Sequence, residues 1–410
     1  MADQLPARLR KRDFLAFTAA ASLPVPWMVA NHFDGLGLEP RVVASLAGMA
    51  ILGGASLLTW AIELAERDIP QAFAILVLAL VSVLPEYAVD LHFAWTAGKD
   101  LSYAPFAVAN MTGANRLLIG VGWAVVVLIA CWRGKTAELV VDRRQLLEIR
   151  FLLWATLYSF LIPLSGTINL ADAALLFCIF GLYARAAMRS DPEEVDLVGP
   201  PAIIDRQFGG VGRRLWALSM FVFAAYGIFI AAEPFAESLV TIGRQSHLDE
   251  FLLVQWVAPL ASESPEFLVA TIFAWRLRGS IGIGALISSK VNQWTLLVGA
   301  IPVAFAISAG GVAGLPLDAR QTEELILTSA QSILATMLIV DLRFSRVEAL
   351  ILAALFLGQF LFTSTETRYF FIGLYLAITL GIYVFGGPQR RSAFNAVLLP
   401  GREVECEEPT

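Results

Sequence analysis

The stretch LPEYAVDLHFAW at residues 84–95 places a glutamate inside an apolar segment, and SPEFLVATIFAW at residues 264–275 repeats its pattern. Both share the Pro-Glu pair and the closing Phe-Ala-Trp, and Glu86 and Glu266 lie 180 positions apart. Matched stretches this far apart indicate an internal duplication. The sequence therefore predicts a chain built from two related halves.

Two later matches extend the duplication. Residues 115–122 can be laid on residues 292–299 at a spacing of 177, and residues 170–173 on residues 346–349 at a spacing of 176. A spacing that drifts slowly along the chain is what small loop insertions produce within one duplication.

The composition indicates a membrane protein. Of the 410 residues, 58% are hydrophobic and 16% are charged, and the mean hydropathy is +0.70. Soluble domains carry about a quarter charged residues. The net charge of −6 offers no basic surface for nucleic acid. The three cysteines, Cys131, Cys178 and Cys406, have neither disulfide-framework nor zinc-site spacing.

The apolar residues gather into blocks of about 18–25 residues, the length that crosses about 30 Å of hydrocarbon. We predict twelve transmembrane helices, at 14–32, 41–64, 70–97, 103–132, 148–167, 169–188, 214–242, 249–276, 281–309, 323–341, 346–363 and 369–386. The first block follows a basic cluster and resembles a signal peptide. We interpret it as an uncleaved span, because Pro24, Pro26 and Trp27 continue the apolar run.

The distribution of Lys and Arg among the loops predicts the orientation of the chain in the membrane. Along an alternating twelve-span path, the clusters at 8–12, 133–144, 185–214, 276–278, 343–346 and 390–391 all fall on one side. The opposite loops, at 165–169, 310–319 and 363–368, hold few positive charges. The positive-inside rule then predicts an integral protein of the cell inner membrane with both termini in the cytoplasm.

Each repeat contains five predicted spans, which is an odd number, so two copies in series enter the membrane from opposite faces. Inverted repeats of this kind are typical of secondary transporters, whose substrate site lies near the midplane at the repeat interface. The predicted fold is all-α and polytopic: an N-terminal extra helix (1–40), a first inverted repeat (41–188), a cytoplasmic linker (189–213), a second inverted repeat (214–363), and an extra helix with a tail (364–410).

Glu86 and Glu266 both lie within apolar blocks. A charged residue at the centre of a membrane helix costs about 2.5–3.5 kcal/mol on insertion scales, and a bound cation would offset that cost. Ser82 and Ser262 stand four residues earlier, on the same helical face. Each following proline lacks an N–H and so frees a backbone carbonyl. A carboxylate, a hydroxyl and a free carbonyl are hard oxygen ligands suited to Na⁺ or Ca²⁺.

With these residues the chain resembles the cation/calcium exchanger superfamily, in which a Ser-x-Pro-Glu helix precedes a Gly-Ser-Asn-rich helix in each repeat. The resemblance covers about residues 41–363. It implies the sodium/calcium exchanger fold, alternating access, and Glu86, Glu266, Ser82 and Ser262 as cation ligands. It also implies exchange of one cation against a sodium or proton gradient.

The partner helices depart from the family pattern, and two registers that differ by two residues remain open for the first copy. One of them places Thr112 opposite Ser289 and Asn115 opposite Asn292. The candidate ligands on these helices are Thr112, Asn115, Ser289, Asn292 and Gln293.

Arg116 and Lys290 bring positive charges onto the same helices. Either could pair with Glu86 or Glu266 and occupy a cation site permanently, which would favour proton coupling or a single transported ion. Alternatively, both side chains face the cytoplasmic vestibule or extend outward.

Further acids lie close to the two glutamates. Glu263 stands three residues before Glu266, and Asp90 four residues after Glu86. Two neighbouring carboxylates raise the pKa of one of them, as a proton carrier requires; alternatively, Glu263 attracts cations in a wet cavity. We expect Glu233 and Glu237 to form a gate or a structural pair, and His92 to be a packed polar residue.

The leading hypothesis is a secondary active antiporter that moves Ca²⁺ or another small cation against Na⁺ or H⁺. The alternatives are a Na⁺/H⁺ or Ca²⁺/H⁺ exchanger in which Arg116 or Lys290 fills one cation site, and an intramembrane lipid-processing enzyme. The expected partners are inorganic cations and the lipid bilayer. No cofactor and no nucleic acid are expected, and homo-oligomerisation is left open.

Overall fold

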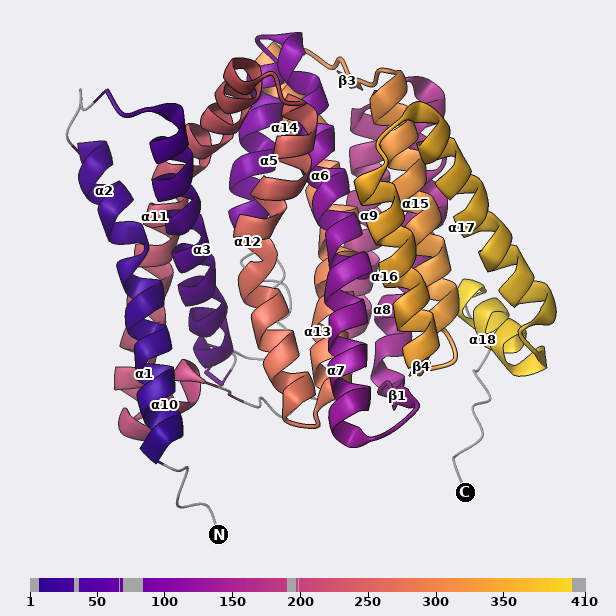
Figure 1. Cartoon of the computed structure of the whole chain (residues 1–410), viewed down its shortest axis with the longest axis horizontal. Coiled ribbons are helices and arrows are strands. Elements are labelled where there is room, and N and C mark those ends of the chain that lie inside the picture. Colours follow the sequence, from indigo (N-terminus) through magenta and orange to yellow (C-terminus); the bar gives the residue numbers. More distant parts are fainter. Residues whose placement is uncertain are drawn as a thin grey trace. The chain divides into compact units, whose positions relative to one another are not determined.

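The computed structural model describes residues 7–32, 37–65, 67–68, 84–189, 197 and 199–399 (Figure 1). The chain forms two compact units: unit 1 contains Met1–His92 and Ala187–Glu266, and unit 2 contains Phe93–Ala186 and Phe267–Thr410. Each unit therefore combines segments of both predicted repeats. The repeat boundaries drawn from the sequence stay a prediction, since the compact units divide the chain differently.

The helices of unit 1 differ widely in length, from the 8 residues of α10 to the 37 of α11. They are α1 (Ala7–Ser22), α2 (Pro24–His32), α3 (Pro40–Ala65), α10 (Pro200–Gln207), α11 (Gly210–Ser246) and the greater part of both α5 (Leu84–Ala97) and α12 (Glu250–Trp275).

Unit 2 contains ten helices within the described residues, besides the ends of α5 and α12, and four very short strands. The helices are α6 (Ala104–Leu117), α7 (Ala124–Gly134), α8 (Leu146–Ser159), α9 (Leu170–Ala187), α13 (Gly279–Asn292), α14 (Val298–Ala309), α15 (Ala319–Ile339), α16 (Arg346–Leu361), α17 (Thr365–Phe385) and α18 (Pro388–Leu398). The strands are β1 (Glu138–Val140), β2 (Thr167–Ile168), β3 (Leu315–Pro316) and β4 (Arg343–Ser345).

The all-α polytopic fold is confirmed. Eight helical stretches of the described chain are long and apolar enough to cross a membrane. Of the other predicted blocks, 70–97 lies partly outside the described residues, and 249–276 and 346–363 correspond to α12 and to the 16-residue α16. The block at 323–341 forms α15, which begins with a charged turn.

Local structure repeats with the sequence. Asp172 accepts a hydrogen bond from the backbone of Asn169 at 2.7 Å, and the Asn169 amide oxygen accepts one from Asp172 in return. Ser345 and Glu348 form the same reciprocal cap at the start of α16. The predicted match between residues 170–173 and 346–349 thus reflects one capping motif used twice.

The strand pairs have the symmetry of inverted repeats. β1 precedes α8 and pairs antiparallel with β4, which precedes α16. β2 precedes α9 and pairs antiparallel with β3, which precedes α15. The fourth helix of each repeat is therefore linked, through the strand before it, to the fifth helix of the other. Figure 1 shows β1 and β4 at the lower end of unit 2 and β3 at its upper end.

A third repeated feature is a wide turn in each partner helix. α6 continues into α7 through a π-helical segment at Leu118–Trp123, and α13 continues into α14 through another at Gln293–Leu297. Single π-turns occur often at functional sites. Their starts lie 175 residues apart, so Asn115 and Lys290, each three residues before a π-segment, are structurally equivalent. The sequence alignment that pairs Asn115 with Asn292 uses a spacing of 177, which is two residues larger. The π-turns therefore favour the register in which Asn115 is equivalent to Lys290.

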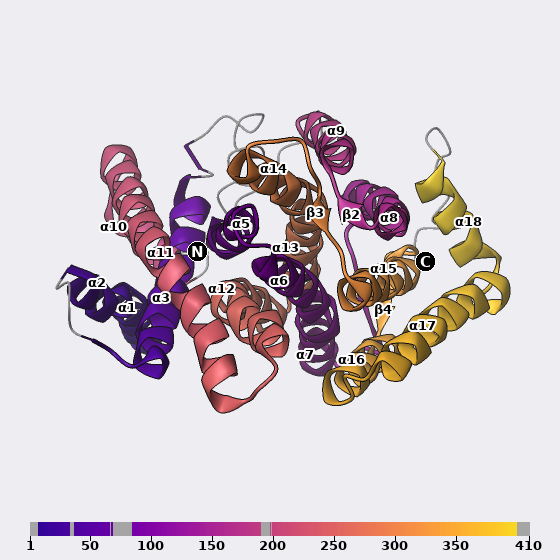
Figure 2. The same ribbon diagram turned by 90° about the horizontal axis from the view of Figure 1, so that it is seen from above.

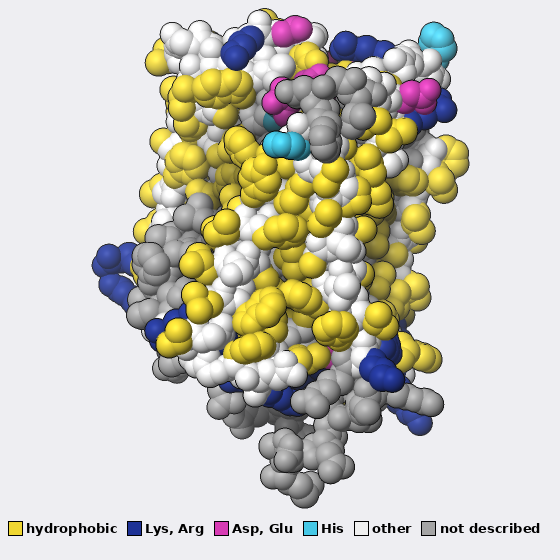
Figure 3. Space-filling model, turned by 90° about the vertical axis from the view of Figure 1, so that its left-hand side faces the viewer, with side chains coloured by type: hydrophobic (Ala, Val, Ile, Leu, Met, Phe, Trp, Pro, Cys, Tyr) yellow, Lys and Arg dark blue, Asp and Glu magenta, His cyan; other side chains and the backbone are white. Residues whose placement is uncertain are grey.

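Unit 1 is held together by close packing of α3 against α11, α1 and α2. The indole N–H of Trp27 on α2 donates to the carbonyl of Ile230 on α11 at 3.0 Å, so the first predicted span is part of this bundle. Figure 3 shows hydrophobic side chains over most of the face on the α2 side, with Lys and Arg at its upper edge and toward its lower end. On α11, exposed hydrophobic residues recur every three to four positions: Val211, Leu215, Leu218, Val222, Tyr226 and Phe229.

Ion pairs attach the short helix α10 to the ends of α3 and α11. Arg213 binds Asp68 and Asp205 through contacts of 2.8 and 2.7 Å, and Arg67 binds Asp205 at 2.7 Å. The hydrogen bond from Arg213 lowers the pKa of the Asp68 carboxyl below its ordinary value. The Arg213–Asp68 pair, which joins the ends of α3 and α11, is therefore present at neutral pH and is lost only as the pH falls through that lowered pKa.

Gly53 allows α3 to pack closely against the bend between α1 and α2. A Cβ at this position would lie 2.6 Å from the carbonyl oxygen of Ala20, whereas a Cβ at Gly181 on α9 would meet nothing within 4 Å. We expect Gly53→Ala to cost about 1–3 kcal/mol by overpacking and to lower the thermal unfolding midpoint in detergent. Gly181→Ala, the matched control, should leave the midpoint unchanged or raise it. A Gly53→Ala protein as stable as wild type would contradict the packing.

Candidate functional site

Glu86 lies in the first turn of α5 and is buried, with 1% of its surface exposed. Its carboxylate is within hydrogen-bonding reach of the Ser262 hydroxyl on α12, and the Glu266 carboxylate is close enough for the two charges to interact. Asp90, one turn further along α5, is fully buried. Within unit 1, the two Pro-Glu helices therefore bring their acids together, as the sequence predicts.

The α12 side of this cluster contains Ser262 and Glu263, which are 3% and 0% exposed, and Glu266, which is half-buried. Ser262 also approaches the carbonyls of Ala258 and Pro259 at 3.4 Å, so its hydroxyl is only weakly engaged by its own helix. Ser82 lies outside the described residues, and its role stays a prediction from the sequence.

The surroundings of the Glu86 carboxylate favour cation binding. Its Oε2 atom is buried and has no hydrogen-bond partner in the described part of the chain. Buried polar atoms are almost always satisfied, and an exception indicates a functional role such as ion binding. No group of three Asp, Glu, His or Cys side chains among the described residues converges as a rigid metal site would. Hydroxyl, amide and carbonyl oxygens would have to complete the coordination.

His92 and Glu237 form a second polar pair in unit 1. The Nε2 atom of His92 lies 3.0 Å from the carboxylate of Glu237, and the Glu237 side chain is 37% exposed. His92 is thus engaged with an acid of α11 and is not packed alone, and Glu237 is the member of the Glu233–Glu237 pair that it contacts.

Unit 2 contains the candidate ligands of the partner helices. The predicted positions are all buried: Thr112, Asn115, Arg116, Ser289, Lys290, Asn292 and Gln293. The Ser289 hydroxyl and the Asn292 amide oxygen have no hydrogen-bond partner among the described residues. They are available as oxygen ligands, whereas Thr112 donates to the carbonyl of Val108 at 2.7 Å.

The two positive charges of these helices lie inside the protein. Arg116 is 2% exposed and Lys290 is 0% exposed, so the alternative in which both extend outward or into the vestibule is wrong. The Lys290 ammonium donates to the side-chain oxygen of Asn115 at 2.7 Å and to its backbone carbonyl at 3.3 Å. Arg116 instead pairs with Glu324 on α15 at 2.5 Å.

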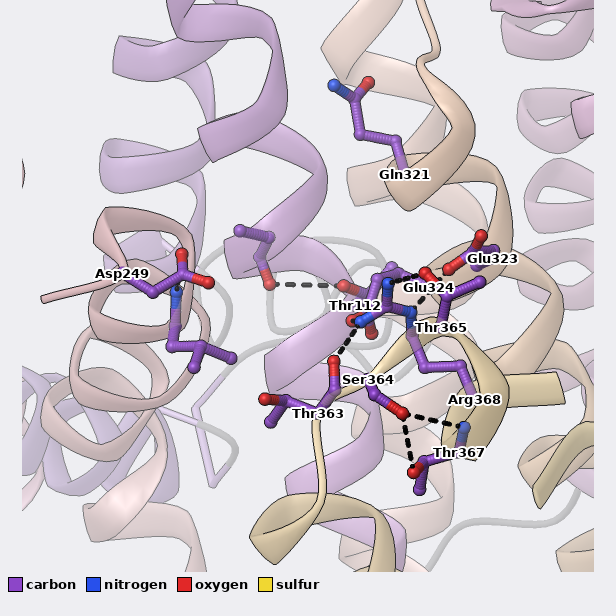
Figure 4. Close-up of polar contacts among 12 residues, drawn as sticks. Thr112, Asp249, Gln321, Glu323, Glu324, Thr363, Ser364, Thr365, Thr367 and Arg368 are labelled. Atoms are coloured by element: carbon purple, nitrogen blue, oxygen red, sulfur yellow. Dashed lines mark hydrogen bonds and ion pairs between the residues drawn. The ribbon is translucent and has the colours of Figure 1, made fainter. Parts of the chain in front are cut away.

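Glu324 belongs to a buried charge network that the sequence analysis missed. Figure 4 shows Glu323 and Glu324 on α15 facing Arg368 on α17. Arg368 contacts Glu323 at 2.6 Å and Glu324 at 3.9 Å. Two acids and two arginines thus balance their charges, and α15 lies between α8 and α17 (Figure 2). The available signal was that opposite charges start two apolar blocks, at 323–324 and at 368.

Amides continue this network to the π-turn of α6. Gln331 on α15 donates to the backbone carbonyl of Arg116 at 3.2 Å, and Gln359 on α16 donates to Gln331 at 3.1 Å. A π-turn interrupts the regular helical hydrogen bonds. The Gln331 amide therefore satisfies a carbonyl at the point where the helix widens.

An all-helical membrane bundle with buried acids, duplicated Pro-Glu helices and polar π-turns defines the class of ion-coupled transporters. The sequence profile of the family described as sodium/calcium exchanger protein matches residues 42–188 and 216–365, which is more than half of the chain. The chain belongs to that family. It is a multi-pass membrane cation antiporter and not an enzyme, which excludes the lipid-processing alternative.

Several solved structures are similar. One titled H⁺/Ca²⁺ exchanger CAX is 42% identical with a TM-score of 0.88, covering 94% of this chain and 98% of that one. The exchanger NCX_Mj, at 15% identity and a TM-score of 0.53 over 78% of this chain and 97% of that one, shares the fold. Native YfkE also shares the fold, at 15% identity and a TM-score of 0.57, covering 89% of this chain and 99% of that one. No curated protein sequence matches this chain.

Removing one member of the Arg116–Glu324 pair should destabilise the protein much more than removing both members together. Glu324→Gln leaves a buried guanidinium without its countercharge and is expected to destabilise the protein by about 3–5 kcal/mol. The double variant Arg116→Gln with Glu324→Gln removes both charges and should recover a large part of that loss. Melting in detergent, monitored with size-exclusion profiles, measures both.

Glu138 provides the matched control, because its pair with Arg343 at 3.0 Å is exposed. Glu138→Gln should cost no more than about 1 kcal/mol. A double variant no more stable than Glu324→Gln alone would contradict a charge-balanced pair.

Proposed function

We propose that this protein exchanges Ca²⁺ for H⁺, with Glu86 and Glu266 as the carboxylates to which the two ions bind in turn. The observation that carries the proposal is the buried Glu86 carboxylate, with an oxygen that has no partner in the described chain and a second carboxylate beside it. Two adjacent acids in hydrocarbon are stable when they share a divalent cation or when protons neutralise them. Either ion can therefore fill the same place, but both cannot do so together.

The choice of ions follows from chemistry and from similarity. Ca²⁺ takes oxygen ligands from carboxylates, carbonyls and hydroxyls in flexible geometry, which suits a site without three converging acids. The 42% identity to a protein titled H⁺/Ca²⁺ exchanger supports the same pair of ions here. Ser262 would supply a hydroxyl ligand, and Asp90 and Glu263, both fully buried, are acids that a proton could reach from Glu86 and Glu266.

Neutralising either glutamate should stop exchange. In proteoliposomes with an imposed pH gradient, Glu86→Gln and Glu266→Gln are each expected to reduce uptake of radiolabelled Ca²⁺ by more than about tenfold, or 1.4 kcal/mol. Proton movement, followed with an internal pH dye, should fall in parallel. Glu366→Gln, at an exposed acid that begins α17, is the control and should transport normally. Ca²⁺ uptake that follows a sodium gradient without proton movement would overturn the ion pair proposed.

We further propose an inner-membrane location with both termini in the cytoplasm, which the distribution of Lys and Arg supports. The orientation can be tested with single cysteines in a cysteine-free background. An impermeant maleimide added to intact cells should label Gly311→Cys, in a loop poor in positive charge, and should leave Lys135→Cys unlabelled until the cells are opened. Both positions are exposed. The reverse pattern would reject the orientation.

A further inference from the structure

Lys290 and Asn115 occupy equivalent places in the two repeats. Each stands three residues before the π-segment of its partner helix. The two side chains also touch, since the Lys290 ammonium lies 2.7 Å from the Asn115 amide oxygen. Equivalent residues meet where a twofold axis passes between them, as in an isologous contact. Position 290 of the second repeat thus holds a cation where the first repeat holds the neutral amide of Asn115.

The surroundings of the Lys290 ammonium resemble the coordination of an alkali ion. Its Nζ atom approaches two oxygens of Asn115, the side-chain amide at 2.7 Å and the backbone carbonyl at 3.3 Å. The ring of Trp294 covers another side, with its centroid at 4.4 Å. Amide and carbonyl oxygens bind hard cations, and an aromatic face attracts a desolvated positive charge. We define these atoms of Asn115 and Trp294 as the ammonium cradle.

The other positive charge nearby has a different role. Arg116 is one residue from Asn115, but its guanidinium forms an ion pair with Glu324, and Arg368 continues the pair to Glu323. That network is balanced in charge and holds α6 against α15. The Lys290 ammonium also donates to uncharged oxygens, those of Asn115, and these oxygens could equally bind a free cation.

We propose that the Lys290 ammonium is a tethered cation that fills a monovalent-ion subsite at Asn115, so that Na⁺ neither binds there nor drives exchange. The inference rests on the proposed function, because it names one ion that the exchanger does not use. A covalently attached cation cannot be released to either side of the membrane. The subsite consequently contributes positive charge in every state of the transport cycle, and one fewer mobile ion is carried.

Replacing the lysine should open the subsite. Lys290→Asn restores at position 290 the residue type of its repeat equivalent, and Na⁺ should then occupy the cradle. Purified Lys290→Asn protein is expected to melt at a higher temperature in sodium chloride than in choline chloride, because a ligand that binds only the folded state stabilises it. Wild-type protein should melt at the same temperature in both salts. This readout does not require transport and stands even if Ca²⁺/H⁺ exchange is disproved.

Two control variants isolate the effect. Lys290→Arg retains the positive charge and should remain insensitive to Na⁺. Lys99→Asn removes an exposed lysine whose ammonium lies 5.7 Å from the ring centroid of Trp95, and should behave as wild type. A sodium-dependent rise in either control, or none in Lys290→Asn, would overturn the proposal.

Transport by the wild-type protein gives a second test that does not depend on the variant folding. Replacing external choline with Na⁺ should leave the initial rate of proton-driven Ca²⁺ uptake unchanged. In Lys290→Asn vesicles, Na⁺ should compete and lower that rate by at least about twofold. Release of Ca²⁺ from wild-type vesicles on addition of Na⁺ would show that Lys290 does not block a sodium subsite.

Discussion

A charge inside hydrocarbon has to be paired, coordinated or neutralised, and this requirement organises the interior of the protein. Arg116 and Arg368 meet it through Glu324 and Glu323, in a network that joins three helices of unit 2. Lys290 meets it through the oxygens of Asn115 and the face of Trp294. The acids of the Pro-Glu helices lie together in unit 1, where like charges repel and a mobile cation is the natural partner. Fixed charges are balanced by fixed partners, and the buried Glu86 carboxylate keeps an oxygen that no described residue binds.

The duplication explains why the polar features come in pairs. A five-span unit inserted twice must invert, and the crossed pairing of β1 with β4 and of β2 with β3 expresses that inversion inside one compact unit. The helix caps at Asp172 and Glu348 and the two π-turns are features of the ancestral unit that both copies retain. Differences between the copies are then informative, because the fold alone does not require them. Asn115 and Lys290 are such a difference, placed where the two copies meet.

Much of this could be predicted from residues close together in sequence. The Pro-Glu repeat, the apolar blocks and the odd number of spans predict the class of fold, and helical periodicity correctly predicts that Ser262 and Glu266 face the same cluster. The partner of Arg116 could not be predicted, because Glu324 is 208 residues away and its helix looks like the end of an ordinary apolar block. The register of the partner helices also escaped prediction, because the sequence allows two alignments that differ by two residues and hydropathy does not mark the π-turns that distinguish them.

The two cations of the partner helices show why residue chemistry, and not charge alone, separates structure from transport. Arginine has a planar guanidinium that never deprotonates and suits a fixed ion pair, and Arg116 uses it in that way against Glu324. Lysine carries a compact charge at the end of a flexible stem, the side chain nearest to an alkali ion in size and coordination. An arginine at position 290 would keep the charge but spread it over a plane that two oxygens of one residue cannot surround. A lysine beside Asn115 therefore suits the place of a bound monovalent ion better than an arginine would.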